Sequence, residues 1–267
     1  MQPRVVIVVA LFLALLGTLF NLPQREAVAA PPRPDVVLFY LDDNAPYPVR
    51  LWNDPSLTPN LARFVNKGLS FRNSIAVTPQ CGPARAALMT GQYGHNNGVT
   101  RNEMQAYSQS SSLSPKLRSK GYKTVFVGKF HNYLRERYPT RPAMQKLSRD
   151  WSQLDVIWEN QGRFYKWRQY RKERNAKYGT ADNAHSSYQA ARIAVERIRQ
   201  TKKGKPLFLT VSLYDGHEPL KPLRRFEGDP RCKNLSGWSG PAYDEADVSD
   251  KPRWVRKHPR LGEPSYD

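Results

Sequence analysis

The stretch DVVLFYLDDN, residues 35–44, decides the fold. It contains an unbroken apolar run, Val36–Leu41, that ends abruptly in Asp42 and Asp43. A run that is apolar on both faces is typical of a central parallel strand that helices cover on both sides. The acidic pair then falls at the carboxyl end of this strand, which is where ligands bind in open parallel sheets.

Strands and helices alternate along the rest of the chain. Strands are predicted in LSFRNSIAV (69–77), YKTVFVG (122–128) and KPLFLTVSLYDGHEP (205–219), and helices in TPNLARFVNKG (58–68), residues 83–90, LSPKLRSKG (113–121) and ADNAHSSYQAARIAVERIRQTKKG (181–204). The last helix carries an apolar stripe of Ala190, Ile193, Ala194 and Ile198. This alternation predicts an α/β fold with a largely parallel sheet flanked by helices.

Capping residues set the expected helix ends. Thr58 and Ser114 each precede a proline in the first turn of a predicted helix, and a glycine follows each helix. Leu61 and residues 64–65 give the first of these helices an apolar face. The pair Asp182 and Asn183 precedes the long helix, and we expect it to cap that helix rather than to bind a metal ion.

The segment from Trp151 to Tyr178 does not follow the alternation. Its aromatic residues are interleaved with basic residues between positions 158 and 177. Such a pattern can bind single-stranded nucleic acid through stacking and charge. The alternative, which we favour, is a solvated helix or an insertion loop lying over the sheet.

Charge and the first thirty residues narrow the classes of partner. The 267 residues carry a formal net charge of +19, which favours an anionic partner such as a nucleic acid, an acidic membrane surface or an acidic substrate. Arg4, the apolar run 5–20 and AVAA at 27–30 are typical of a secretory signal peptide, residues 1–29. The run is shorter than a spanning helix requires, although an uncleaved anchor is the alternative. We therefore expect a secreted, periplasmic or lumenal protein without a nucleic-acid partner or stable membrane insertion.

Cys81 and Cys232 are the two cysteines of the chain, and an exported protein suggests a disulfide between them. The sequence around Cys81, PQCGPARAALMTGQ (79–92), suggests another use. Pro83 sets the first turn of a helix, whose dipole favours negative charge near Cys81. Arg85 lies one turn further along the same face.

Other polar residues also follow predicted strands. Asp42 and Asp43 offer oxygen ligands for a hard ion such as Ca²⁺ or Mg²⁺, although Asp-Asp-Asn is also common in turns. Lys129 and His131 are two residues apart, which places them on one side of an extended segment, where they suit an anion and proton transfer. His217 stands alone in DGHEP, and a lone histidine near a turn is more often a surface or capping residue than a catalytic one.

The segment CGPARAALMTG (81–91) resembles the sulfatase signature, a Cys-x-Pro-x-Arg core followed by a short apolar helix. In the same order, LDDN (41–44), GKFH (128–131) and SLYDGHEPLKP (212–222) resemble the family's first metal-ligand pair, its Lys-x-His element and its substrate-facing histidine. GQYGHNNGVT (91–100) and YDEADVSDKPRWVR (243–256) look most like the branch of N-acetylglucosamine-6-sulfatases and arylsulfatases. The resemblance runs from about Asp35 to the end of the chain.

The resemblance implies the fold of the alkaline phosphatase superfamily and a Cα-formylglycine made from Cys81 by a separate maturation enzyme. Residues 30–267 would be the N-terminal portion of a sulfatase catalytic domain that is incomplete at its C-terminal side, because the family's second metal pair and second lysine would lie beyond residue 267. The expected cation is Ca²⁺, with Mg²⁺ as the alternative, and its expected ligands are Asp42, Asp43 and the oxygen of modified Cys81.

The resemblance also implies catalytic roles for four further residues. Arg85 would orient the formylglycine, and Lys129 would bind the sulfate oxygens. His131 would transfer a proton, and His217 would bind sulfate or assist departure of the alcohol. The expected substrate is a sulfated small molecule or glycan, with a glycosaminoglycan as the first choice. Two alternatives stay open: a phosphonate or phosphodiester hydrolase of the same superfamily, and an inactive sulfatase-like chain that binds anionic glycans.

Overall fold

The computed structural model describes residues 33–43, 54–71, 74–159, 163–232 and 246–257. The predicted signal peptide, residues 1–29, lies outside this range. Among the described residues, no helix combines the length and the hydrophobicity that crossing a membrane would require.

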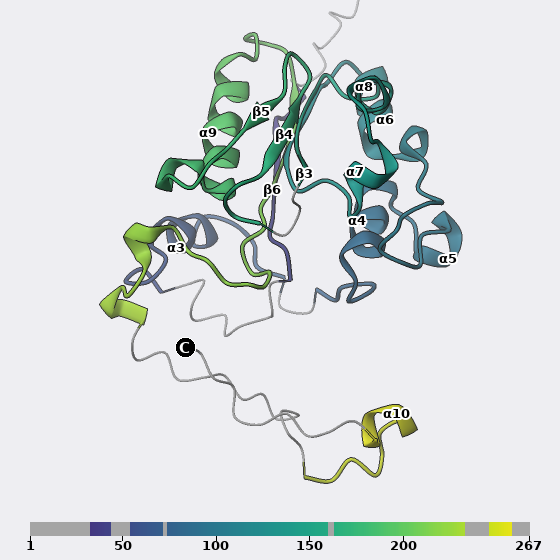
Figure 1. The fold of residues 1–267 in the computed structure, drawn as a ribbon, viewed down its shortest axis with the longest axis vertical. Helices are drawn as coiled ribbons and strands as arrows, with labels where there is room; N and C mark the ends of the chain where they lie inside the picture. The colour runs from purple at the N-terminus through teal and green to yellow at the C-terminus, as the bar shows by residue number, and fades with distance from the viewer. Residues whose placement is uncertain (1–32, 44–53, 72–73, 160–162, 233–245, 258–267) are drawn as a thin grey trace, which may run out of the picture. The chain divides into compact units, whose positions relative to one another are not determined.

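One six-stranded sheet forms the centre of the fold, in the order β1-β6-β2-β3-β4-β5 (Figure 1). Its strands are β1 (Val36–Tyr40), β2 (Lys123–Gly128), β3 (Gln153–Glu159), β4 (Arg168–Arg171), β5 (Ala176–Lys177) and β6 (Leu207–Ser212). The pairs β1–β6, β6–β2 and β2–β3 are parallel, whereas β4 and β5 continue the sheet in antiparallel order. This confirms the predicted α/β fold with a largely parallel sheet.

Helices cover both faces of β2 and β6. The α-helices are α3 (Pro59–Val65), α4 (Cys81–Thr90), α5 (Gly94–Asn97), α6 (Leu113–Ser119), α7 (Leu134–Arg137), α8 (Arg141–Ser148), α9 (Ser186–Arg199) and α10 (Arg253–Arg256). Because side chains alternate along a strand, Val125 and Val127 of β2 pack toward α9, whereas Phe126 packs with Ala86 and Met89 of α4. Figure 1 shows α9 on one side of the sheet and α4, α6 and α8 on the other.

β1 lies at an edge of the described sheet, and the prediction that it is a central strand is wrong for this part of the chain. It pairs only with β6 among the described strands, and Val37 and Phe39 are 54% and 60% exposed. The strand is apolar on both faces, but the described residues cover only one of them.

The two segments that follow β1 also differ from expectation. α3 starts at Pro59 as predicted, yet it buries Ala62 and leaves Leu61 and Phe64 exposed. The described residues within 69–77 form no strand, because no neighbouring strand pairs with them. Local propensity predicted these elements, whereas a partner strand decides whether a β-strand forms.

The described part of residues 151–178 contributes three strands to the sheet, which the sequence did not predict. These strands are β3, β4 and β5 rather than a solvated helix or an insertion loop. Trp158, Phe164, Trp167 and Tyr170 are buried in the cores on either side of these strands, so they are not available as a nucleic-acid stacking surface. Tyr165 is half-buried.

Two predicted caps are displaced. α6 begins one residue before Ser114, and the buried Ser114 hydroxyl instead donates a hydrogen bond to the carbonyl oxygen of Asp150 at 2.6 Å. Asp182 and Asn183 lie in a short 3₁₀ helix, and His185 caps α9 by accepting a hydrogen bond from the Ser187 amide at 3.2 Å. Ile198, predicted in the buried stripe of α9, is 46% exposed.

A buried ion pair joins α9 to β3, and it gives the first testable prediction. Asp155 is fully buried and accepts two hydrogen bonds from Arg197, at 2.7 and 2.9 Å. Asp155→Asn should lower the free energy of unfolding by about 3 to 5 kcal/mol, because a buried guanidinium loses its charged partner. Glu173→Gln is the matched control, because Glu173 contacts the same arginine but its side chain is 48% exposed. That control should cost under about 1 kcal/mol. Equal urea midpoints for the two variants would contradict the prediction.

Candidate active site

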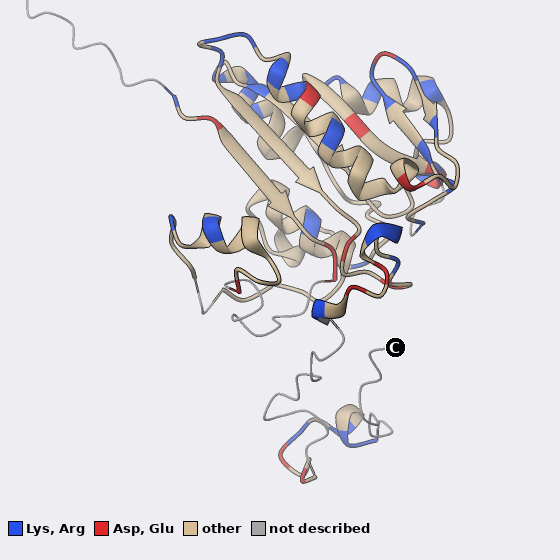
Figure 2. Cartoon of the chain, turned by 90° about the vertical axis from the view of Figure 1, so that its left-hand side faces the viewer, with Lys and Arg blue, Asp and Glu red and all other residues tan. Residues whose placement is uncertain are grey.

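The carboxyl ends of three parallel strands meet the start of α4. Asp42 follows β1, Lys129 follows β2 and His217 follows β6, while Cys81 is the first residue of α4. Figure 2 shows acidic segments just beyond the tips of the long strands. The parallel order of the sheet therefore brings residues from distant parts of the sequence to one edge.

Asp42 is a buried carboxylate held between two cations. Its Oδ1 accepts a hydrogen bond from Arg85 Nη2 at 3.0 Å, and its Oδ2 forms a very short contact with Lys129 Nζ. Burial raises the pKa of Asp42, but the neighbouring charges of Arg85 and Lys129 outweigh it and leave the pKa below its usual value. Asp42 is therefore ionised at neutral pH.

Arg85 ties three strand ends together. Besides Asp42 after β1, its Nη1 donates to the carbonyl oxygen of Lys129 after β2, at 2.7 Å, and to the hydroxyl of Ser212 at the end of β6, at 2.8 Å. Its guanidinium also lies over the ring of Tyr40, 5.0 Å from the centroid. Because these contacts use most of its donors, Arg85 fixes the site as well as supplying charge.

Cys81 presents its thiol to the acidic pair. Its Sγ lies 3.3 Å from Asp43 Oδ1, and the residue is half-buried. Burial raises the pKa of the Cys81 thiol, and the carboxylates of Asp42 and Asp43 raise it further, although Lys129 acts in the opposite direction. Cys81 is a free thiol in the structure, which does not support the disulfide alternative. A thiol that is protonated at neutral pH is a poor nucleophile in its own right.

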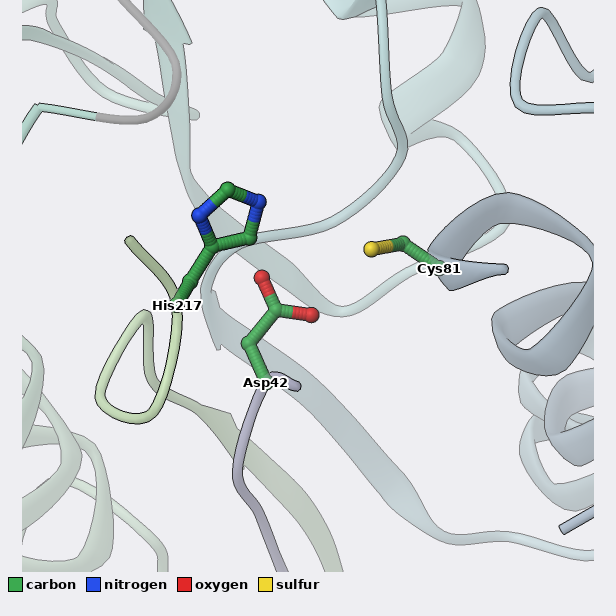
Figure 3. A group of neighbouring side chains, drawn as sticks. All are labelled: Asp42, Cys81 and His217. Carbon is green, nitrogen blue, oxygen red and sulfur yellow. The ribbon is translucent and has the colours of Figure 1, made fainter. Parts of the chain in front are cut away.

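His217 completes a group of potential ligands with Asp42 and Cys81. One ligand atom from each of the three lies within 4.8 Å of the others (Figure 3). His217 Nε2 is also 3.5 Å from Asp43 Oδ2. Because His217 Nδ1 lies 2.5 Å from the carbonyl oxygen of Glu218, which can only accept, the proton of the neutral ring belongs on Nδ1. The lone pair of Nε2 then faces the acidic pair.

These donors fit part of the coordination sphere of a divalent cation. Two carboxylates near one imidazole supply the charge and the hard oxygen atoms that Ca²⁺ or Mg²⁺ prefers. Ca²⁺ takes about six to eight oxygen ligands, so the remaining positions need water, substrate or further polypeptide. Lys129 already contacts Asp42, and a bound cation would compete with it for that oxygen.

His131 lies deeper than the other predicted residues. Its ring contacts Tyr107 and Phe130, with centroids 4.2 and 3.8 Å away. Complete burial lowers the pKa of His131 well below its usual 6.5, and the charges of Arg85 and Arg137 lower it further. Lys129 contacts Asp42, whereas the described ring contacts of His131 are with Tyr107 and Phe130. Its part in proton transfer stays a prediction.

The buried His131 predicts a pH dependence of stability. The folded state prefers the neutral ring, so below pH 6.5 the unfolded chain binds the proton that the folded chain rejects. The free energy of unfolding should be highest above pH 6.5 and decline as the pH falls toward 5. Asp42 does not interfere, because its pKa lies below 3.8.

The measurement is a series of urea unfolding curves between pH 7.5 and 5. His131→Phe should flatten the decline, whereas His95→Gln, which removes an exposed histidine, should leave it unchanged. An unaltered slope in His131→Phe would contradict the assignment.

Sequence reasoning missed several residues that support the site. Ser212 binds Arg85, and Tyr214 lies against Lys129 Nζ, 4.8 Å from its ring centroid. Asp215 accepts a hydrogen bond from the Asp42 amide at 3.2 Å through its carbonyl oxygen. The sequence did contain one signal for Ser212, because this polar residue lies near the end of the apolar run 207–213.

Comparison with known proteins places this geometry in a family. The sequence profile of the family described as Sulfatase matches residues 34–243. The chain is 32% identical over 110 residues to an N-acetylglucosamine-6-O-sulfatase of Bacteroides thetaiotaomicron, covering 41% of this chain and 19% of the relative. It is 27% identical over 235 residues to the extracellular sulfatase SULF-1 homolog of Drosophila melanogaster, covering 84% of this chain and 20% of the relative.

A solved structure shares the fold. It is a protein in complex with its substrate D-glucosamine-2-N,6-O-disulfate, and it matches 79% of this chain and 40% of its own, with a TM-score of 0.60 and 22% identity. The chain thus spans less than half the length of each of these three relatives. Since the family profile covers most of the chain, and the fold agrees, the chain belongs to the sulfatase family.

Proposed function

We propose that this chain carries the nucleophile side of a sulfate-ester hydrolase, with Cys81 as the precursor of a formylglycine. The observation that supports this most is the position of Cys81 at the start of α4. Its side chain points at Asp43, and Arg85 is anchored one turn further on. The raised pKa of the thiol makes it a poor nucleophile, which fits a side chain that must first be modified.

The described side chains fit a formylglycine at Cys81 and a divalent cation beside it. Sγ of Cys81 stands where the aldehyde oxygen would be after a maturation enzyme has oxidised the side chain. The formylglycine would supply an oxygen nucleophile, and a bound divalent cation, Ca²⁺ or Mg²⁺, would polarise the sulfate and stabilise developing negative charge. Asp42, Asp43 and the modified Cys81 would hold the cation.

The chain's own residues position the substrate and move protons. Arg85 keeps Asp42 ionised and oriented, and Lys129 offers a cation to the sulfate oxygens when the substrate competes with Asp42 for it. His217 can donate a proton from Nε2 to the departing alcohol once protonated, while Glu218 holds its ring by Nδ1. His131 would carry a transferred proton only transiently, because burial and the charges of Arg85 and Arg137 disfavour its protonated form.

The overall reaction breaks the bond between sulfur and the alcohol oxygen of the ester. Water supplies the hydroxyl that ends on sulfate, and the alcohol oxygen takes a proton. The high positive charge of the chain favours an anionic substrate, and relatives named for sulfated amino sugars make a sulfated glycan or its small fragment our first choice. An exported location, with residues 1–29 as the signal peptide, belongs to the same proposal; one relative is named an extracellular sulfatase.

The test is coexpression of the chain with a formylglycine-generating enzyme. The expected result is a Cys81 peptide whose mass changes from thiol to aldehyde, together with release of inorganic sulfate from a 6-sulfated glucosamine measured by ion chromatography. A bis-aryl phosphodiester and a phosphonate monoester are assayed in parallel. Preferential release of a phosphorus product would favour the phosphonate or phosphodiester hydrolase instead.

A second candidate function has one observation in its favour. Asp42 is already neutralised by Lys129 and Arg85, an arrangement that needs no divalent cation. An inactive sulfatase-like chain that binds anionic glycans would keep this arrangement. Modified protein that binds sulfated glycans but releases no sulfate would support this candidate and contradict hydrolysis by this chain.

A further inference from the structure

A pocket opens beside the loop that carries His217. It has a volume of about 500 Å³, and its lining includes Arg163, Lys166, Lys221 and Arg224. All four of these basic residues are exposed at its rim. Positive charge gathered around a concavity favours an anionic ligand, and the mechanism above uses none of these residues.

The floor of this basic pocket is built from packed rings. Phe164 is buried, and both Phe164 and Tyr165 contact the ring of buried His185, at 5.1 and 5.2 Å between centroids. His185 donates from Nε2 to the carbonyl oxygen of Lys221 at 2.9 Å, while its Nδ1 accepts from the Ser187 amide. The cap of α9 therefore fixes the backbone of Lys221 in the pocket.

The acidic side chain of Asp182, next to the pocket, already has hydrogen-bond partners. Asp182 Oδ1 accepts hydrogen bonds from the Arg224 amide at 3.0 Å and from the Tyr165 hydroxyl at 3.3 Å. The guanidinium of Arg224 lies over the Tyr165 ring, 6.0 Å from its centroid, and also donates to the Thr180 carbonyl at 3.2 Å. These contacts stack the Arg224 guanidinium on the Tyr165 ring and hold a cation in place for an anionic group.

The pocket and the candidate active site are linked by packed side chains and by one loop. Tyr214 contacts Phe164 on one side and His217 on the other, with ring centroids 6.2 and 6.0 Å apart. Pro219 and Lys221 lie two and four residues after His217 in the same loop. A chain of sugar units bound at His217 can therefore reach the pocket with an adjacent unit.

We propose that this basic pocket binds a second sulfate or carboxylate of a polyanionic glycan, on a sugar unit next to the one that carries the reacting sulfate. The proposal rests on the proposed function for the placement of the reacting sulfate. It defines the substrate class as an oligosaccharide with anionic groups on neighbouring units. Guanidinium and ammonium groups at the rim form charge-assisted hydrogen bonds with the second anion.

The test compares two double variants with equal charge change. Arg163→Gln with Lys221→Gln removes two charges from the pocket, and Lys202→Gln with Lys203→Gln removes two exposed charges before β6, at the opposite end of that strand. The unmodified chain, which keeps the Cys81 thiol, is used so that no ligand is consumed. Calorimetry measures Kd for a heparin-derived tetrasaccharide sulfated on every unit, for glucosamine-6-sulfate, and for a single-stranded oligonucleotide of equal charge.

The pocket variant should raise Kd of the tetrasaccharide about tenfold and leave Kd of glucosamine-6-sulfate within about twofold, as expected for the loss of one or two charged contacts. The control variant should change both by less than about twofold. Equal losses in the two variants, or no measurable tetrasaccharide binding, would overturn the proposal. Tighter, pocket-dependent binding of the oligonucleotide would overturn it in favour of a nucleic-acid site. Pocket-dependent binding without sulfate release from the matured protein would instead contradict the proposed function alone.

Discussion

Replacing Cys81 with alanine is expected to abolish sulfate release, with a fall in kcat of about 10⁴-fold or more, because no other described side chain can replace the lost nucleophile precursor. The sulfur of Cys81 is the atom that faces Asp43 at 3.3 Å, and it lies within 4.8 Å of ligand atoms on Asp42 and His217. Removing it leaves Asp42 and Asp43 in place but takes away one expected cation ligand and the group that attacks sulfur. Sulfate release by ion chromatography measures the effect.

Cys232→Ala is the matched control, since it removes the other cysteine and should leave both turnover and the Cys81 modification unchanged. The folded state should tolerate Cys81→Ala, because the residue is half-buried and its thiol makes a single described hydrogen bond. An unchanged urea midpoint with lost turnover therefore separates chemistry from folding. Cys81→Ala protein that still releases sulfate at the original rate would show that Cys81 is not the nucleophile.

Much of the α/β core was predictable because its signals are local. β2 and β6 are apolar on both faces and are buried on both faces. α4 ends before Gly91, whose φ of 68° lies in the left-handed region, as the sequence predicted, although it begins at Cys81, two residues before the predicted start. In these elements, periodicity and capping agree with the final packing.

The remaining elements depend on neighbours that a single stretch of sequence does not reveal. β1 is as apolar as a central strand, yet the described sheet places it at an edge. The aromatic residues of 151–178 resemble a stacking surface in sequence. In the structure, however, β3 and β4 pair in antiparallel order, and Trp158 and Tyr170 on these strands are buried. Burial of this kind follows from strand pairing, which no local pattern encodes.

The candidate site shows the same division. Asp42, Arg85 and Lys129 were predicted from their motifs, and the structure joins them in one set of hydrogen bonds. His217 was a weak candidate from its surroundings alone, and only the parallel order of β1 and β6 brings it near Asp43. The role of Ser212 could not be foreseen, because it depends on the distance between two strand ends.

That dependence on a close approach makes Gly128→Ala the second substitution with a large expected effect. Gly128 ends β2 opposite Ser212 of β6, and its φ of 101° is unfavourable for other residues. A Cβ at this position would lie 1.8 Å from the Ser212 carbonyl oxygen. The strands would have to separate, which breaks the bond from the Lys129 amide to that oxygen and displaces the hydroxyl that binds Arg85.

The expected loss in the free energy of unfolding is about 4 kcal/mol, the combined cost of backbone strain and overpacking. Gly204→Ala is the control that separates the two terms, because Gly204 has a similar φ of 78° but no atom within 4 Å of the added Cβ. That control should cost about 1 to 2 kcal/mol. Urea unfolding measures both, and sulfate release should fall in Gly128→Ala even below its unfolding midpoint, because Arg85 and Lys129 lose their shared anchor. Equal midpoints for the two alanine variants would show that β2 and β6 can separate at this point without loss, and Gly128 would then be required only for its backbone angle.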